Sequence, residues 1–380
     1  MKKLLLIHNF YREFGGEDSN LKEEIAFLNS SFETMLYSES NAEKLNIADY
    51  YSYIFRSNPK SNRKLKKILI EYNPSTVYIH NTWFKVNLGI FKILNKKKIN
   101  TVVKIHNFRY FCASSFFAKN HFNENLICHA CGNIRSKNRI LNKYYSDSYL
   151  KSFILIYFTK KLQKIILQNN IKVIAISKFH KMKLLNSGFK DDNIFVIPNP
   201  VLTRDHKLKN VDSKNIVYAG RLTGEKGIEE LLFNWSKIKK NYNLQIIGEG
   251  HLKKTIEKKY REYKNIEFLG FLNNEDTLDC IRNARAVITA TKLFEGQPRL
   301  LCEATSLGVL SIYPSFGGMD ELFPTNYKFS FEQFNYKNMV EKINLLDDSK
   351  LVSDESKRLQ DFSLNFFKPS KVLNLYKKVL

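Results

Sequence analysis

The stretch that decides the fold is NIVYAGRLTGEKGIEELL, residues 215–232. Its apolar beginning, which ends at Gly220, predicts a buried strand, and the apolar spacing after Lys226 predicts a helix. The loop between them places Arg221 and Lys226 beside the helix amino end, where free amides and the helix dipole favour an anion. The segment therefore predicts a site for a phosphate or, better, a diphosphate, whereas a solvated turn with incidental basic residues is the alternative.

The order of strand, loop and helix recurs along the chain. Alternating units of this length build parallel, doubly wound sheets, whose ligands bind beyond the carboxyl ends of the strands. Two prolines at 194–201 and the polar segment 203–215 indicate a linker, so we predict an α/β protein of two Rossmann-like domains. The apolar runs that predict buried strands are 2–8, 75–81, 101–107, 172–177, 215–220, 244–250, 265–271, 286–291 and 309–315.

Composition excludes several classes of protein. The 380 residues, 43% hydrophobic and without low-complexity tracts or repeats, are too many for a peptide or a disulfide miniprotein and too apolar for a disordered chain. Residues 1–200 hold 32 Lys and Arg against 14 Asp and Glu, and residues 201–380 hold 29 against 23. This excess favours polyanionic partners, namely nucleic acid, an anionic membrane or phosphorylated small molecules, unless it reflects only a lysine-rich proteome.

A second motif is LFEGQPRLLCEATSLG, residues 293–308, in which Glu295 and Glu303 stand eight residues apart. Pro298 suits the first turn of a helix, so residues 296–299 are expected to present backbone amides at a second helix start. Carboxylates beside such amides are suited to accept hydrogen bonds from sugar hydroxyls. An acidic helix start stabilised by its own dipole is the alternative.

In their order and spacing, the two motifs resemble the C-terminal half of retaining group 1 (family 4) glycosyltransferases. These enzymes transfer sugars from nucleotide diphosphates and have the GT-B fold, two Rossmann-like domains facing each other across a cleft. The resemblance implies that Arg221 and Lys226 hold the donor diphosphate, that Glu295 contacts the transferred sugar and that Glu303 contacts the ribose. It also assigns to the donor site Gly250 and Phe271, from the GEG and LGF loops, and the turn residues Gly296, Gln297, Pro298, Arg299 and Leu300.

Further segments extend the resemblance over nearly the whole chain. HNFYREFGGED resembles the first glycine loop, which implies that Gly15 and Gly16 lie against the donor phosphates, and GGMDE (317–321) resembles the GGxxE motif. IHNFRYFC resembles the loop with a histidine beside the reacting sugar, here His106, although a packed core histidine is equally common. The tail 366–380 resembles a helix that crosses back to the first domain. The predicted domains are 1–202 for the acceptor, 203–360 for the donor, and 361–380 for this helix.

The chain departs from the family pattern at two places. Gln297 replaces a frequent aromatic residue, and Thr223-Gly224 replaces a frequent Ser-Pro, so the donor sugar stays open. The resemblance implies a same-face mechanism in which a donor phosphate oxygen takes the acceptor proton. Arg221, Lys226 and the amides near 296–299 then supply a positive field without a metal or cofactor. Glu295 as a nucleophile, and His106 as a positioning group, are the catalytic candidates.

The cysteines allow two interpretations. Cys112, Cys128 and Cys131, with His121 or His129 nearby, have ligands suited to structural zinc, or they are free thiols in a loop shaping the acceptor side. Cys280 and Cys302 are expected to be small buried hydrophobic residues.

The chain is expected to stay in the cytosol, since no segment resembles a secretory signal or a membrane span. Residues 135–168 mix Lys and Arg with apolar residues, which predicts either a helix at the cytoplasmic face of an anionic membrane or a core-facing helix with extended lysines. Together the features predict a glycosyltransferase that acts on a glycan or lipid-linked glycan in bacterial surface polysaccharide synthesis, such as lipopolysaccharide O-antigen or capsule. The alternatives are a nucleotide-sugar epimerase of the same fold and a basic nucleic-acid-binding protein, although no nucleic-acid signature is present.

Overall fold

The computed structural model describes the chain apart from residues 12–15, 42–51, 53, 108–148 and 202–212. Its described residues form two compact units. Unit 1 holds the described residues up to Pro200 together with Pro369–Leu380, and unit 2 holds those of Val201–Lys368. The segment that rejoins unit 1 therefore begins at Pro369, whereas the sequence placed that beginning at residue 361.

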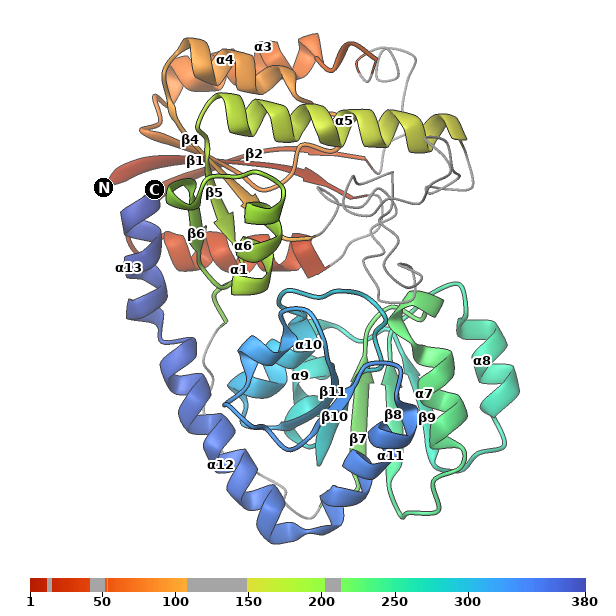
Figure 1. The fold of residues 1–380 in the computed structure, drawn as a ribbon. Helices are drawn as coiled ribbons and strands as arrows, with labels where there is room; N and C mark the ends of the chain where they lie inside the picture. The colour runs from red at the N-terminus through yellow and green to blue at the C-terminus, as the bar shows by residue number, and fades with distance from the viewer. Residues whose placement is uncertain (12–15, 42–51, 53, 108–148, 202–212) are drawn as a thin grey trace. The chain divides into compact units, whose positions relative to one another are not determined.

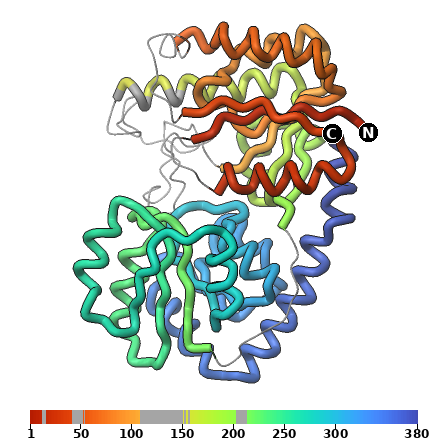
Figure 2. The backbone as a smooth tube through the Cα atoms, turned by 180° about the vertical axis from the view of Figure 1, so that it is seen from behind, coloured from red at the N-terminus to blue at the C-terminus, as the bar shows by residue number. Residues whose placement is uncertain are grey.

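Unit 1 contains a six-stranded parallel sheet in the order β2-β1-β3-β4-β5-β6. Helices cover both faces, with α3, α4 and α5 on one side and α1, α6 and α13 on the other (Figures 1 and 2). Because both faces are covered, strand residues such as Leu4–Ile7 are buried in one unbroken run. The strands are β1 (Lys2–Phe10), β2 (Phe32–Ser40), β3 (Thr76–Ile79), β4 (Asn100–Ile105), β5 (Lys172–Ala175) and β6 (Ile194–Val196). The helices are α1 (Gly16–Leu28), α3 (Pro59–Glu71), α4 (Gly89–Lys96), α5 (Tyr149–Gln168), α6 (Lys178–Asn186) and α13 (Pro369–Val379).

Helix α13 is part of the core of unit 1. Val372, Tyr376 and Val379 pack with Leu21 and Leu28 of α1 against the sheet. Thr76 at the start of β3 donates a hydrogen bond to the carbonyl of Leu380 over 2.8 Å. A segment that follows all of unit 2 in the sequence thus completes the first unit.

Unit 2 contains a second parallel sheet of six strands, in the order β12-β11-β10-β7-β8-β9. Helix α11 lies beside α7, and α12 lies beside α10. The strands are β7 (Asn215–Ala219), β8 (Asn243–Ile247), β9 (Ile266–Gly270), β10 (Ala286–Ile288), β11 (Leu310–Ser315) and β12 (Ser330–Glu332). The helices are α7 (Ile228–Trp235), α8 (Lys253–Tyr260), α9 (Asn274–Arg282), α10 (Arg299–Ser306), α11 (Tyr336–Asn344) and α12 (Ser349–Phe366), with short 3-10 turns at Gly224–Lys226, Met319–Leu322 and Leu345–Asp347.

The α/β fold with two Rossmann-like units is the one that the sequence predicts. The sequence missed β2, β6 and β12. Each lies at an edge of its sheet, where one side has no neighbouring strand and where polar residues such as those of FETMLYSES are tolerated.

Candidate functional site: loops at the carboxyl edges of the two sheets

In unit 2, the loops that follow the strands are joined into one surface by backbone hydrogen bonds. The loop after β7 is bonded to the loops after β8 and β10, the loop after β8 is bonded to the end of β9, and the loop after β10 is bonded to the loop after β11. The pairs, each from amide to carbonyl, are Leu222 to Glu249 (2.9 Å), Lys292 to Glu225 (3.0 Å), Gly248 to Gly270 (2.7 Å) and Gly318 to Glu295 (2.7 Å). The two motifs found in the sequence therefore meet at one edge of the sheet.

Close backbone approach explains three glycines of this surface. A Cβ atom on Gly227 would lie 1.9 Å from the carbonyl oxygen of Ala290, one on Gly248 2.0 Å from that of Gly220, and one on Gly250 2.3 Å from that of Leu222. Gly227 and Gly248 also have φ values of +68° and +139°, which favour glycine. Gly250 is thus required by loop packing, which accounts for its presence independently of a ligand.

Lys226 and Glu295 form an ion pair at the centre of this surface. The Nζ atom of Lys226 donates to Oε1 of Glu295 over 2.5 Å, and the side chains are 23% and 18% exposed. Thr291 donates to the same Glu295 oxygen over 3.4 Å. Arg221 stands on the same loop as Lys226, but its side chain is 64% exposed, and its Nη2 atom lies 3.8 Å from Oε1 of Glu225. The predicted diphosphate cations thus lie on the loop that begins α7.

Helix α10 places the second glutamate. Pro298 occupies the N-cap, one position before the predicted first turn, and offers no side-chain cap. The first bond within the helix runs from the amide of Cys302 to the carbonyl of Pro298, so the amides of Arg299 and Leu300 precede the helical ladder. Glu303 is buried and accepts from Nε of Arg299 over 2.6 Å.

The remaining donor-site residues differ in their surroundings. Gln297 and Leu300 are buried, whereas Phe271 is 75% exposed. Gly296 belongs to the loop that leads into α10.

In unit 1, Gly16 begins α1, and a Cβ there would meet no described atom within 4 Å. Gly15 lies outside the described residues. The assignment of these residues to a donor site stays a prediction.

In unit 1, His106 directly follows β4 at the carboxyl edge of the sheet. Its Nε2 atom lies 2.9 Å from Nδ1 of His80, which follows the neighbouring strand β3. Burial is the main cause that lowers the pKa of both imidazoles, that of His80 to about 3 and that of His106 well below its usual value. Lys104 lowers both further, so the two rings are neutral at physiological pH. His106 is half-buried, neither a fully packed core histidine nor an open one.

Sequence reasoning missed His80, although a signal was present. The triplet Ile-His-Asn occurs at 7–9, 79–81 and 105–107, each time at the end of a strand. Ile7 of β1 is paired with Ile79 of β3, which brings His8 and His80 to the same level of the sheet, with ring centroids 6.3 Å apart. Three imidazoles on three adjacent strands therefore line this edge.

A charged network lies beneath the histidines. Lys104 of β4 donates to Glu24 of α1 over 2.6 Å, and both side chains are fully buried. The hydroxyls of Tyr78 and Tyr376 each donate to the other Glu24 oxygen over 2.7 Å. Burial raises the pKa of Glu24, but Lys104 and the hydrogen bonds outweigh it, so the net pKa is lowered and the carboxylate stays ionised. The network joins α1, the sheet and α13.

The predicted zinc ligands Cys112, Cys128 and Cys131 lie outside the described residues. Within the part of the chain that is described, no group of three or more His, Cys, Asp or Glu side chains is arranged to hold a metal. Cys302 is buried as predicted, and Cys280 is partly buried. None of the described helices is long and apolar enough to cross a bilayer.

Two doubly wound α/β units of this kind form the GT-B fold, which solved glycosyltransferase structures share. Residues 202–362, most of unit 2, match the family described as glycosyl transferases group 1.

The chain is also similar to individual proteins of known sequence or structure. An uncharacterized glycosyltransferase of Methanocaldococcus jannaschii is 24% identical over 79% of this chain and 76% of its own. The lipopolysaccharide 1,6-galactosyltransferase of Escherichia coli is 30% identical over 36% of this chain and 40% of its own. The structure of Anabaena HepE with UDP and glucose superimposes with a TM-score of 0.67 at 12% identity, over 100% of this chain and 99% of that one. Several matches to curated relatives span only about half of their length.

Proposed function

We propose that this protein moves a hexose, with retention of anomeric configuration, from a nucleotide-diphosphate sugar to a glycan or lipid-linked glycan. The observation that carries the proposal is the ion pair between Lys226 and Glu295, 69 residues apart in sequence and 2.5 Å apart in unit 2. It unites a cation suited to a diphosphate with a carboxylate suited to a sugar hydroxyl. The bound UDP reported for HepE supports a nucleotide-sugar donor.

In this proposal, the donor breaks the ion pair between Lys226 and Glu295, and each of the two side chains then contacts the donor. Lys226 would turn to the diphosphate together with Arg221, and Glu295 would accept from a sugar hydroxyl. The amides that precede the ladder of α10 add positive field where the leaving diphosphate gains charge. Glu303, held by Arg299, would accept from the ribose. No residue is assigned as general base, because a donor phosphate oxygen takes the acceptor proton; Glu295 as a covalent nucleophile is the competing assignment.

The acceptor and the pathway are inferred from relatives. Matches include a lipopolysaccharide galactosyltransferase and an O-antigen glycosyltransferase of Escherichia coli and an amylovoran glycosyltransferase of Erwinia amylovora. We assign this chain to bacterial surface polysaccharide synthesis at the cytoplasmic face of the membrane. The reaction needs no metal or cofactor in this scheme, since cations and amides of the chain face the diphosphate.

An exposed stripe on α5 supports contact with an anionic membrane. Leu150, Phe153, Tyr157, Lys160 and Lys164 are all exposed and recur at spacings of three and four residues, which places them on one helix face. Apolar residues occupy its first half and lysines its second. Exposed Ile54 and Phe55 extend the apolar half, because the next residue, Arg56, lies over the ring of Tyr157 at 4.4 Å.

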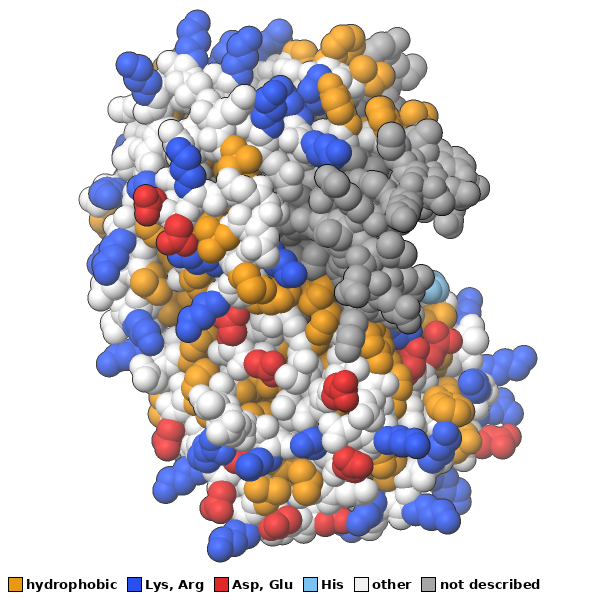
Figure 3. Space-filling model, in the orientation of Figure 1, with side chains coloured by type: hydrophobic (Ala, Val, Ile, Leu, Met, Phe, Trp, Pro, Cys, Tyr) orange, Lys and Arg blue, Asp and Glu red, His pale blue; other side chains and the backbone are white. Residues whose placement is uncertain are grey.

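The surface around this stripe is basic as well as apolar. Figure 3 shows hydrophobic side chains next to Lys and Arg on the part of unit 1 that carries α3 and α5. Apolar residues that insert at the lipid interface and lysines that meet anionic head groups form a recognised pattern of peripheral binding. The bilayer is therefore the partner that this surface fits.

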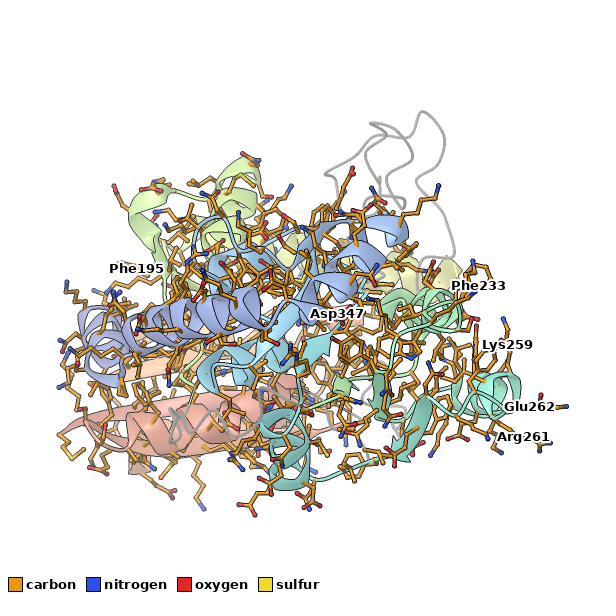
Figure 4. All side chains as sticks on the ribbon, turned by 90° about the horizontal axis from the view of Figure 1, so that it is seen from below. Phe195, Phe233, Lys259, Arg261, Glu262 and Asp347 are labelled. Atoms are coloured by element: carbon orange, nitrogen blue, oxygen red, sulfur yellow. The ribbon has the colours of Figure 1, made fainter. Side chains whose placement is uncertain are left out.

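Vesicle sedimentation tests the membrane contact. We expect binding to phosphatidylglycerol vesicles that weakens with salt, and a loss of roughly tenfold in the double variant Phe153→Ser, Tyr157→Ser. The matched control is Phe233→Ser on α7 of unit 2, an exposed aromatic residue with Lys237 over its ring, which Figure 4 shows at the periphery of that unit. Equal binding of both variants, or equal binding to neutral vesicles, would remove this part of the proposal.

Calorimetric titration tests the donor site. UDP, GDP, ADP, CDP and their common sugar conjugates are titrated into wild type and into Arg221→Ala, Lys226→Ala. We expect one diphosphate to bind wild type and to bind the variant roughly a hundredfold more weakly, because two charge-assisted contacts are lost. The control is Lys240→Ala, which also removes a lysine from an ion pair of unit 2, with Asp347, but next to the amino end of β8.

Two outcomes would redirect the assignment. Binding followed by epimerisation of the donor sugar, without transfer to any acceptor, would favour an epimerase. Absence of nucleotide binding by folded protein would overturn the proposal and reopen the nucleic-acid-binding alternative.

A further inference from the structure

Glu295 stands in a connection that has no regular structure of its own. Residues 289–298, which join β10 to α10 and are all described, form neither helix nor strand. The carboxylate of Glu295 is held by Lys226, and more distantly by the hydroxyl of Thr291. In the proposed function the donor breaks the pair with Lys226. The contacts that keep Glu295 in place in the donor complex must therefore be made by its backbone and its neighbours.

The loop after β11 makes these contacts. Since β10 and β11 are paired and parallel, their loops leave the sheet at the same edge. The amide of Gly318 donates to the carbonyl of Glu295 over 2.7 Å. Gly317 has a φ of +75°, and a Cβ there would lie 2.8 Å from the same carbonyl oxygen. The ring of Phe316 stacks on that of Phe294, with centroids 3.9 Å apart and planes inclined by 21°. Three consecutive residues of one loop therefore touch two consecutive residues of the other.

The loop after β11 is itself fixed to its strand and to the core. The carboxylate of Asp320 accepts hydrogen bonds from the hydroxyls of Tyr313 and Ser315, both on β11, over 3.0 and 2.7 Å. Met319 is fully buried, and Phe316 packs against the core of unit 2. Because this loop is tied down at both ends, it can hold the connection that carries Glu295.

We propose that Phe316 is a positioning residue for recognition of the transferred sugar. Its ring, stacked on Phe294, and the two glycines that follow it keep Glu295 in place after Lys226 has turned to the diphosphate. The carboxylate is then already aligned to accept from a sugar hydroxyl, and such alignment is what recognition and transfer require. The inference rests on the proposed function, because it takes Glu295 as the residue that contacts the sugar. The contacts between the two loops belong to unit 2 alone.

Calorimetry that compares a nucleoside diphosphate with its sugar conjugate tests this role. We expect Phe316→Ala to bind the diphosphate within about twofold of wild type, because the cations for the diphosphate lie on the loop after β7. It should bind the nucleotide sugar on the order of tenfold more weakly, because Glu295 is no longer held for a charge-assisted hydrogen bond. Phe316→Tyr, which keeps the stacked ring, should bind both ligands as wild type does. The matched control is Phe362→Ala on α12, which removes a ring from another half-buried stacked pair, that with Phe366.

A double-mutant cycle separates positioning from a general loosening of unit 2. If Phe316 acts through Glu295, then Phe316→Ala should not weaken sugar binding further in a Glu295→Gln background, whereas an unrelated loosening would add to the loss. Hydrogen exchange of the free protein reports on the contact between the loops without any ligand. Peptides that cover 291–298 should exchange faster in Phe316→Ala and at the wild-type rate in Phe362→Ala.

The possible outcomes distinguish this inference from the proposed function. An unchanged affinity of Phe316→Ala for the nucleotide sugar, an equal loss for the diphosphate, additive losses in the cycle or no rescue by Phe316→Tyr would overturn the positioning role. Unchanged exchange in Phe316→Ala would show that the stacked rings do not hold the connection. If wild type binds no nucleotide, or if Glu295→Gln binds the nucleotide sugar as wild type does, the proposed function of Glu295 fails, and the role of Phe316 in sugar recognition fails with it.

Discussion

The carboxyl edges of the two sheets use opposite electrostatic designs. The edge in unit 1 carries His80 and His106, whose imidazoles are kept neutral by burial, above the fully buried ion pair of Lys104 and Glu24. The edge in unit 2 carries partly exposed ion pairs, such as Lys226 with Glu295 and Arg299 with Glu303. Exposed pairs can exchange partners at small cost, whereas neutral buried donors cannot be screened by salt. The comparison suggests that unit 2 binds charge and that unit 1 orients uncharged groups.

The buried ion pair of unit 1 should give the largest effect. Lys104→Met leaves Glu24 ionised among Tyr78 and Tyr376 with no cation, and we expect a loss of about 3–5 kcal/mol in the free energy of unfolding of unit 1. Residue-resolved hydrogen exchange measures this unit separately from unit 2. The exposed Lys66→Met, on α3, serves as the control and should stay within about 0.5 kcal/mol of wild type. A small effect of Lys104→Met would show that Glu24 takes up a proton once the lysine is lost, so that no unpaired charge stays buried.

Replacing a tightly packed loop glycine of unit 2 should give the second largest loss of stability. Gly227→Ala combines a positive φ with a Cβ 1.9 Å from the Ala290 carbonyl, whereas Gly188→Ala in unit 1 has φ +87° and open space. We expect Gly188→Ala to lower the free energy of unfolding by about 1 kcal/mol, because the backbone is strained. Gly227→Ala should lower it by about 2 kcal/mol more, because the loop after β10 must also move. Chemical denaturation followed by exchange in each unit measures both. Equal losses would show that the loops of unit 2 are not locked together.

Acid should destabilise unit 1 through its neutral histidines. His80 has a pKa of about 3 in the folded protein against 6.5 as the usual value, so the unfolded chain binds more protons below pH 6.5. The stability that this residue contributes is present above pH 6.5 and is lost as the pH falls towards 3, by about 2 kcal/mol at pH 5. Exchange at pH 7.5 and pH 5 checks this. In unit 2 the described histidine is His251, which is exposed, so an equal acid loss there would contradict the assignment to histidine.

The smallest effect belongs to an exposed ion pair. Lys240→Ala removes the ion pair with Asp347, in which the two side chains are 44% and 46% exposed. The free energy of unfolding should fall by no more than about 1 kcal/mol. Thermal melts in low and high salt measure it. A cost above that range would show that Asp347, which also accepts from Tyr242, depends on Lys240 for its position.

The two units also differ in how much could be predicted from sequence. In unit 2, the charged residues of the two motifs stand in loops next to glycines, so Lys226 and Glu295 could be found from residue type and spacing. In unit 1, the candidate site depends on which strands are neighbours. His80 and His106 are 26 residues apart and meet only because β3 and β4 are paired in register. Which strands pair depends on the whole sheet, so a local sequence pattern cannot predict that these two histidines meet. Edge strand β12 was missed for a related reason, since three residues carry too little periodicity.

Tyr376 has a consequence for how the molecule is made. It donates to Glu24 and contacts Lys104, yet the ribosome adds it only after every residue of unit 2. The first unit to leave the ribosome therefore holds a buried carboxylate and lysine without one of their partners until synthesis has passed residue 376. Unit 2, contiguous from Val201 to Lys368, can finish folding first. The order in which the two units mature is thus the reverse of the order in which they are started.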